Sequence, residues 1–144
     1  MTFTAKVVDT DAVDTANLPG GFIFVNRGLL DFVETESQLV GALAHEVGHI
    51  AGHHGLRELY EKVKQAALAK DKTMGQIVDR LGGALAMMRL LRYTREDEVA
   101  AGRLGFYNMI RAGWNPRGLL NLMEISLALT IRPPRRVAPH FARR

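Results

Sequence analysis

The chain has 144 residues, 47% of them hydrophobic, so it is long enough to form one domain with an ordinary buried core. It contains no cysteine, which excludes disulfide bonds and thiolate ligands, so any bound metal must be held by His, Asp or Glu. Nineteen basic and 15 acidic side chains give a formal net charge of +4. Much of this excess lies in a basic tail over residues 132–144, which we expect to be a solvated end and not a specific nucleic-acid-binding segment.

The sequence shows neither a transmembrane segment nor a signal peptide. No stretch reaches the roughly 20 consecutive apolar residues that span a bilayer, so we expect no transmembrane segment in this chain. The N-terminus, MTFTAKVVD, lacks the basic start and apolar run of a signal peptide. Two locations stay open: the cytoplasm, or the periplasm or a membrane surface if the chain is a domain of a longer exported protein. Membrane association would then come from a region outside this chain, and no oligomeric state is indicated.

The N-terminal part is predicted to form a small β-sheet followed by a helix. Thr4–Val8 is rich in β-prone residues, and Phe22–Val25 is a short apolar run after the turn residues Pro19-Gly20-Gly21. Thr35 and Gln38 then fit a capping box at the start of a helix. Apolar residues follow at helical spacing: Leu39, Leu43, Val47 and Ile50.

The remainder of the chain is predicted to be helical. Start and stop signals divide it into segments over residues 56–70, 73–93, 94–113 and 116–129. Pro133 and Pro134 then separate the last helix from the basic tail. We therefore predict that residues 1–144 form one α+β domain, rich in α-helix, with a small N-terminal sheet packed on the helix that starts at Thr35.

The motif HEVGH, residues 45–49, carries the clearest chemistry. Residues four apart on an α-helix differ by only about 40° around its axis, so His45 and His49 project from one face. That spacing lets two imidazole nitrogens bind one zinc ion at roughly 2.0–2.1 Å. Glu46 then takes the proton of the zinc-activated water as general base. A helix on which histidines recur by chance is the alternative, but the capped start and the small residues beside the histidines favour one zinc ion per chain.

A catalytic zinc ion usually takes a third protein ligand and leaves the fourth position for water. Glu96, Asp97 and Glu98 lie at the start of a predicted helix, and spacing alone does not choose among them. Glu96 and Asp97 are otherwise explained as favourable negative charges in a first helical turn. Glu98 has small residues on its side of the helix that would let this helix approach the histidine helix closely: Ala101, Gly102 and Gly105.

Three segments in this order resemble a family of HExxH zinc metallopeptidases of the gluzincin type. This family includes the periplasmic β-barrel-assembly protease, the mitochondrial Oma protease, HtpX-like membrane proteases and prenyl-peptide proteases. The segments are LPGGFIFVNRGLL at residues 18–30, the HEVGH helix at residues 36–55, and residues 95–116, which include REDE, RLG and AGWNP. The resemblance covers the chain from about Val7 to about Pro116.

The resemblance implies a zincin-type fold and a zinc-dependent endopeptidase that acts on polypeptide substrates, with a role in protein quality control. It implies that His45, His49 and Glu98 are the metal ligands and that Glu46 is the catalytic base. It also implies that Phe22–Val25 is an edge strand that pairs with the extended backbone of a substrate.

The sequence departs from this family at two places. The family has an Asp four residues after the ligand Glu, where it accepts a hydrogen bond from a ligand histidine, and this chain has Gly102 there. Losing such a partner typically costs 10–100-fold in metal affinity or activity. The C-terminal His-Pro segment of the family has no clear counterpart, since Pro139 precedes His140. An alternative function is therefore a degenerate, non-catalytic zinc-binding or chaperone-like module that binds unfolded or assembling chains, although the intact Glu46 favours the enzyme.

Other side chains are candidates for secondary roles. His53 lies four residues after His49 and is a candidate to line the same face, as an oxyanion donor or an additional ligand. His54 is expected to face solvent. Three tyrosines could donate to a developing oxyanion, although packing is their more common role: Tyr60, Tyr93 and Tyr107.

Overall fold

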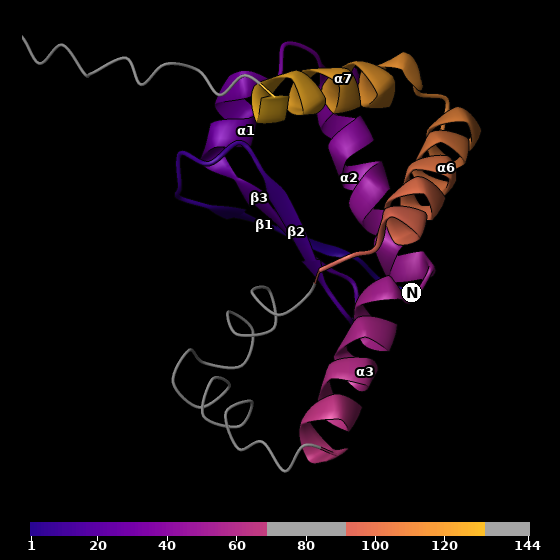
Figure 1. The fold of residues 1–144 in the computed structure, drawn as a ribbon. Coiled ribbons are helices and arrows are strands. Elements are labelled where there is room, and N and C mark those ends of the chain that lie inside the picture. Colours follow the sequence, from indigo (N-terminus) through magenta and orange to yellow (C-terminus); the bar gives the residue numbers. More distant parts are fainter. Residues whose placement is uncertain (69–91, 132–144) are drawn as a thin grey trace, which may run out of the picture.

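The computed structural model describes residues 1–68 and 92–131. The predicted helix over residues 73–93 falls almost entirely outside these ranges, as do the basic tail and His140. The described residues form an α+β fold that is rich in helix, with a small N-terminal sheet, as predicted (Figure 1). Within this part of the chain, no helix is both long and apolar enough to cross a membrane.

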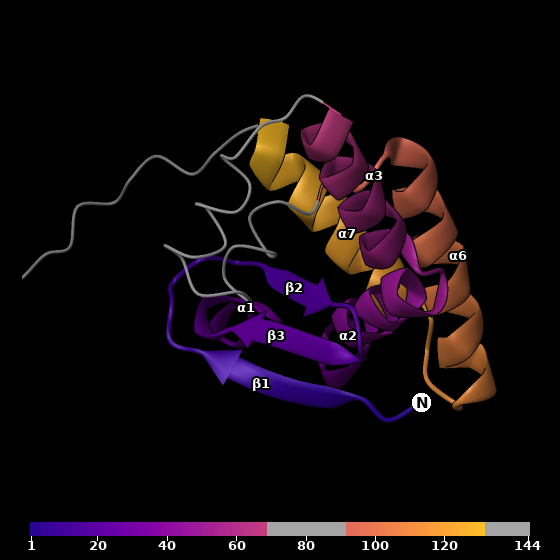
Figure 2. The ribbon, with the colours of Figure 1, turned by 90° about the horizontal axis from the view of Figure 1, so that it is seen from below.

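The sheet has three strands, β1 (Thr4–Val8), β2 (Thr15–Leu18) and β3 (Phe22–Asn26), in the order β1-β3-β2 (Figure 2). Strand β1 runs parallel to β3, and β2 runs antiparallel to it. Gly20 and Gly21 connect β2 to β3 with φ angles of 99° and 94°, a left-handed conformation that favours glycine. The predicted turn is therefore the reversal of a β-hairpin, and its first strand, β2, was not predicted.

The central position of β3 corrects one expectation from the sequence. Phe22–Val25 is not an edge strand, because β3 pairs with β1 on one side and with β2 on the other. Ile23 and Val25 of β3 are buried in the main core cluster. The edge strand nearest the helices is β2, which Figure 2 shows beside α2.

Helix α2 (Glu36–Ala51) is the centre of the fold and lies between the sheet and helix α6 (Figure 1). It follows the short helix α1 (Arg27–Phe32), which was not predicted. The predicted capping box is present. The Thr35 hydroxyl accepts a hydrogen bond from the backbone N–H of Gln38, and the Gln38 side chain accepts one from the backbone N–H of Thr35. The start of α2, and with it the position of the HEVGH motif along the helix, is therefore encoded locally.

Three further helices complete the described structure: α3 (His54–Leu68), α6 (Arg95–Arg111) and α7 (Arg117–Ile131). Helix α6 packs closely on α2 because the residues between them are small. A Cβ atom on Gly48 would overlap the backbone of Ala101, and one on Gly105 would lie 2.9 Å from the Ala44 carbonyl oxygen. This close approach brings the first turn of α6 next to the histidines of α2.

Candidate metal centre

Three potential ligand atoms converge where α2 and α6 meet. His45 Nε2 lies 3.1 Å from Glu98 Oε2 and 3.1 Å from His49 Nε2, and the third separation, His49 Nε2 to Glu98 Oε2, is 3.6 Å. A tetrahedral zinc ion with bonds of about 2.0–2.1 Å keeps its ligand atoms about 3.4 Å apart. The spacing and the donor set therefore fit zinc, and they bring together the three residues that the sequence indicated as ligands.

The Glu98 carboxylate has the charge that a metal ligand needs. Hydrogen bonds with His45 and His49 lower the pKa of Glu98 to about 2, although its partial burial acts in the opposite direction. A ligand carboxylate must be ionised to bind a metal. The side chain of Glu98 is 50% exposed, whereas that of His49 is 2% exposed, so the site is open to solvent on the α6 side. This leaves room for the fourth ligand position of a catalytic metal.

Asp97, the neighbour of Glu98, has a structural role. Its side chain accepts from the backbone N–H of Thr94, and the Thr94 hydroxyl accepts from the backbone N–H of Asp97, which forms the capping box of α6. Asp97 also forms an ion pair with Arg57 of α3. Burial alone would raise the pKa of Asp97, but the hydrogen bonds from Thr94 and Arg57 outweigh it and lower the pKa. Of the three carboxylates, Glu98 is the one whose oxygen lies beside the nitrogens of both His45 and His49, and Glu96 is not part of this group.

Glu46 is held by the edge strand β2. Its side chain is buried, and its two carboxylate oxygens accept hydrogen bonds of 2.6 Å from the Thr15 hydroxyl and from the Asn17 amide. The Tyr93 hydroxyl in turn donates to Asn17 Oδ1 at 2.8 Å. Burial raises the pKa of Tyr93 to about 12, so this hydroxyl stays protonated and remains a donor. Thr15 and Asn17 were not among the predicted site residues, because β2 was not predicted. Their signal is a pair of polar residues two positions apart, which share one face of a strand.

Two aromatic rings hold His49. The Tyr93 ring stacks on it with 3.9 Å between centroids and 21° between planes. His54 Nδ1 lies 3.1 Å from His49 Nδ1, and His54 is 4% exposed, so the expectation that His54 faces solvent is wrong. Burial lowers the pKa of His54. His53, by contrast, is exposed and has a left-handed φ of 54°, so the helical spacing that suggested a place beside His49 does not hold there.

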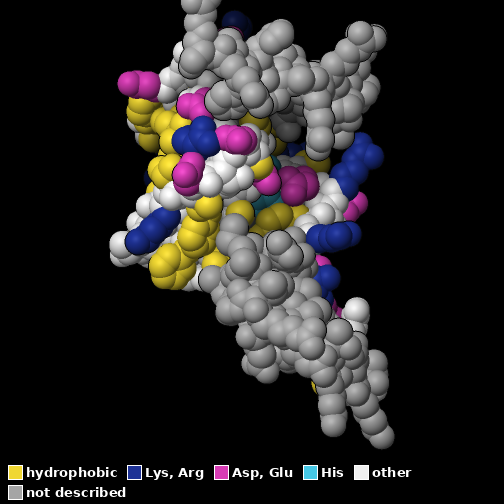
Figure 3. All heavy atoms as spheres, turned by 90° about the vertical axis from the view of Figure 1, so that its left-hand side faces the viewer, with side chains coloured by type: hydrophobic (Ala, Val, Ile, Leu, Met, Phe, Trp, Pro, Cys, Tyr) yellow, Lys and Arg dark blue, Asp and Glu magenta, His cyan; other side chains and the backbone are white. Residues whose placement is uncertain are grey.

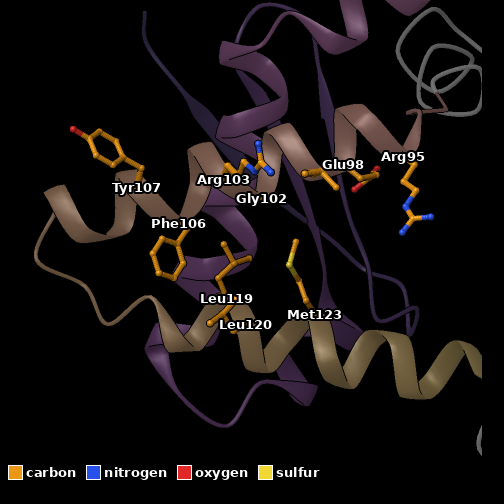
Figure 4. Close-up of a pocket in the computed structure, with 10 residues that line it drawn as sticks. Arg95, Glu98, Gly102, Arg103, Phe106, Tyr107, Leu119, Leu120 and Met123 are labelled. Carbon is orange, nitrogen blue, oxygen red and sulfur yellow. The ribbon is translucent and has the colours of Figure 1, made fainter.

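His45 has a different environment from His49. Its Nδ1 atom is buried and has no hydrogen-bond partner among residues 1–68 and 92–131. Gly102 occupies the position where the resembled family has an Asp, and a Cβ atom there would lie 3.2 Å from the Met123 methyl group of α7. The expectation that Gly102 allows α6 to approach α2 is therefore wrong; Ala101 and Gly105 do this. In Figure 4, Gly102 lies one turn after Glu98, on the wall of a pocket.

This pocket is a largely apolar groove of about 530 Å³ between α6 and α7. Glu98 lines it together with apolar side chains such as Phe106, Leu119 and Met123 (Figure 4). The groove therefore adjoins the candidate metal centre. On the face of the molecule that Figure 3 shows, histidine is visible only as a small area set back in the surface, with acidic side chains beside it.

Comparison with known proteins agrees with this geometry. Residues 2–141 match the model of peptidase family M48. The chain is 25% identical to the β-barrel assembly-enhancing protease of Escherichia coli (strain K12), over 93% of this chain and 31% of that protein. It is 27% identical to the mitochondrial metalloendopeptidase OMA1 of Arabidopsis thaliana, over 77% of this chain and 23% of that protein. It is 26% identical to the metalloprotease YcaL of Escherichia coli (strain K12), over 86% of this chain and 51% of that protein.

The chain thus spans about a third of the length of the first of these relatives. The match to the family model, in contrast, extends over nearly all residues of this chain, including the two helices that carry the candidate ligands. The chain therefore belongs to peptidase family M48.

Proposed function

We propose that the chain is a zinc-dependent endopeptidase that hydrolyses peptide bonds of polypeptide substrates. His45, His49 and Glu98 would hold one zinc ion, and Glu46 would be the general base. The observation that carries this proposal is the convergence of the three ligand atoms at separations of 3.1–3.6 Å, on the helix that also bears Glu46. Membership of a peptidase family supports the same chemistry.

The residues of the chain divide the catalytic work between them. Zinc, when bound, is a Lewis acid that polarises a carbonyl group and makes a water molecule more acidic. Glu46 takes the proton of the attacking water and later gives it to the leaving amine. Its carboxylate keeps free lone pairs after accepting from Thr15 and Asn17, so these two contacts orient the base without blocking it.

We infer that the substrate binds in an extended conformation along the free edge of β2. In the described part of the chain, β2 pairs with β3 on one side only. Because Thr15 and Asn17 of β2 contact Glu46, this edge runs beside the catalytic base. Strand addition uses main-chain hydrogen bonds and needs few particular side chains. It therefore suits unfolded polypeptides, in keeping with a role in protein quality control.

The test combines metal analysis with hydrolysis of unfolded casein. The purified chain should contain one zinc ion, lose it to a strong chelator and regain both zinc and hydrolysis when zinc is added. Glu46→Gln should keep the zinc while hydrolysis falls by about 10²-fold or more, because the proton acceptor is removed. A parent chain that stays free of metal after zinc is added would refute the proposal. Equal rates for the parent and Glu46→Gln would show that Glu46 is not the base.

One observation favours a second candidate, a non-catalytic zinc-binding or chaperone-like module. The Nδ1 atom of His45 has no partner among the described residues, and a ligand histidine without an orienting partner weakens a catalytic site. A chain that binds zinc and unfolded casein, but leaves the casein intact, would support this candidate over the endopeptidase.

A further inference from the structure

We propose that His54 is a positioning residue that orients His49 for metal binding by accepting a hydrogen bond at Nδ1. This inference rests on the proposed zinc site and adds a residue to it. The two Nδ1 atoms are 3.1 Å apart, within hydrogen-bond distance. The side chains of His54 and His49 are 5% and 2% exposed, so water has little access to the pair. A buried ring nitrogen in such a place needs a partner inside the protein.

The direction of the hydrogen bond follows from the position of the ligand atoms. His49 Nε2 faces the Nε2 atom of His45 and the carboxylate of Glu98, so it is the atom available to a metal. A neutral imidazole that binds metal through Nε2 carries its proton on Nδ1. His49 Nδ1 therefore donates, and His54 Nδ1 accepts.

The other nitrogen of His54 is consistent with this arrangement. If His54 accepts at Nδ1, its own proton is on Nε2, and that atom lies 3.8 Å from Asp97 Oδ1. Asp97 forms an ion pair with Arg57, so a negative carboxylate faces the protonated nitrogen. This distance is beyond a direct hydrogen bond, but the charge still favours the Nε2–H tautomer of His54. The three side chains thus form a series from Asp97 through His54 to His49.

The turn between α2 and α3 is built around the His54 ring. A Cβ atom on Gly52 would overlap that ring, so a larger residue at position 52 would displace it. The next residue, His53, has a φ of 54°, which a residue other than glycine seldom adopts. This conformation turns the chain sharply after α2 and directs His54, the first residue of α3, back towards His49. Such backbone conformations tend to occur at functional sites.

Three variants separate positioning from packing. His54→Phe keeps the size of a buried ring but removes the acceptor. His54→Asn restores an acceptor oxygen close to the position of Nδ1. His53→Asn is the matched control, because it changes the exposed neighbouring histidine to a residue that tolerates a left-handed φ.

The first measurement is zinc affinity, by titration against a competing chelator. We expect a loss of about 10–100-fold in His54→Phe, the range typical for removing a partner of a ligand histidine. His54→Asn should recover most of this loss, and His53→Asn should bind like the parent. Equal affinities for the parent and His54→Phe would overturn the proposal. So would equal losses in His54→Phe and His54→Asn, since packing alone would then explain the effect.

The second measurement is the ¹⁵N NMR spectrum of the histidines in the zinc-loaded parent, and it does not depend on whether His54→Phe folds. His49 should be the Nδ1–H tautomer, with a correlation between its Nδ1 proton and the Nδ1 nitrogen of His54. The absence of that correlation would overturn the proposal. If the parent takes up no zinc, the proposed zinc site is refuted. The same NMR correlation, measured in the metal-free protein, then still decides whether His54 accepts a hydrogen bond from His49.

Discussion

Replacing Gly102 by Asp tests whether the unpartnered nitrogen of His45 weakens the candidate metal centre. Gly102 follows Glu98 by one turn of α6, and Glu98 Oε2 already lies 3.1 Å from His45 Nε2. When His45 binds metal through Nε2, its proton is fixed on Nδ1, which has no acceptor within residues 1–68 and 92–131. A buried donor without a partner costs about 1–3 kcal/mol. An Asp at position 102 should supply the acceptor, and the Met123 methyl group, 3.2 Å from the new Cβ, is the flexible end of a side chain that can move.

The size of the effect follows from these terms. The unpaired Nδ1 proton destabilises the metal-loaded state. An acceptor that restores about 1.4 kcal/mol of this free energy would raise zinc affinity about tenfold. Gly102→Ala is the matched control, since it also removes a helical glycine, worth about 0.5–1 kcal/mol of stability, and also contacts Met123, but adds no acceptor. Zinc titration against a competing chelator and initial rates on unfolded casein should place Gly102→Asp above both the parent and Gly102→Ala. If Gly102→Asp binds zinc no more tightly than Gly102→Ala, the unpartnered Nδ1 atom of His45 does not weaken the site.

Three other predictions follow from the contacts of single side chains. Thr15→Val removes one of two donors to the Glu46 carboxylate, so hydrolysis should fall by about tenfold while zinc content stays the same; an unchanged rate would contradict a role for β2 in holding the base. Glu98→Gln should lower zinc affinity at least about tenfold, whereas Glu96→Gln should leave it unchanged because Glu96 is not part of the group with His45 and His49; equal losses would show that the ligand is misplaced. The hydrogen bonds to Asp97 outweigh its burial and place its pKa in the folded state below 3.8, so its charge stabilises the fold above pH 3.8 and this contribution is lost as the pH falls. Asp97→Asn should therefore have a lower unfolding temperature than the parent at neutral pH, and the difference should shrink below pH 3.8; a constant difference would contradict this.

Expectations that depended on local sequence agreed with the structure. The predicted box of Thr35 and Gln38 starts α2, and the helix predicted to begin at residue 94 is α6, whose start the structure shows to be a box of Thr94 with Asp97. The four-residue spacing of His45 and His49 likewise placed both rings on one side of α2. The strand β2 was missed because it has only four residues, Thr15–Leu18, too few for their alternation to stand out, and because pairing with β3 is what defines it.

By itself, then, the sequence determined a capped helix with two histidines and a glutamate in metalloprotease spacing, and a second capped helix with three candidate carboxylates. The tertiary structure decided which carboxylate meets the histidines, because the small residues between α2 and α6 determine how closely these helices approach. It also decided the partners of the other groups. Glu46 is held from β2, about 30 positions earlier in the chain, and His49 is held by His54 across a turn with a left-handed residue. These contacts join separate elements, and no periodicity within one element encodes them.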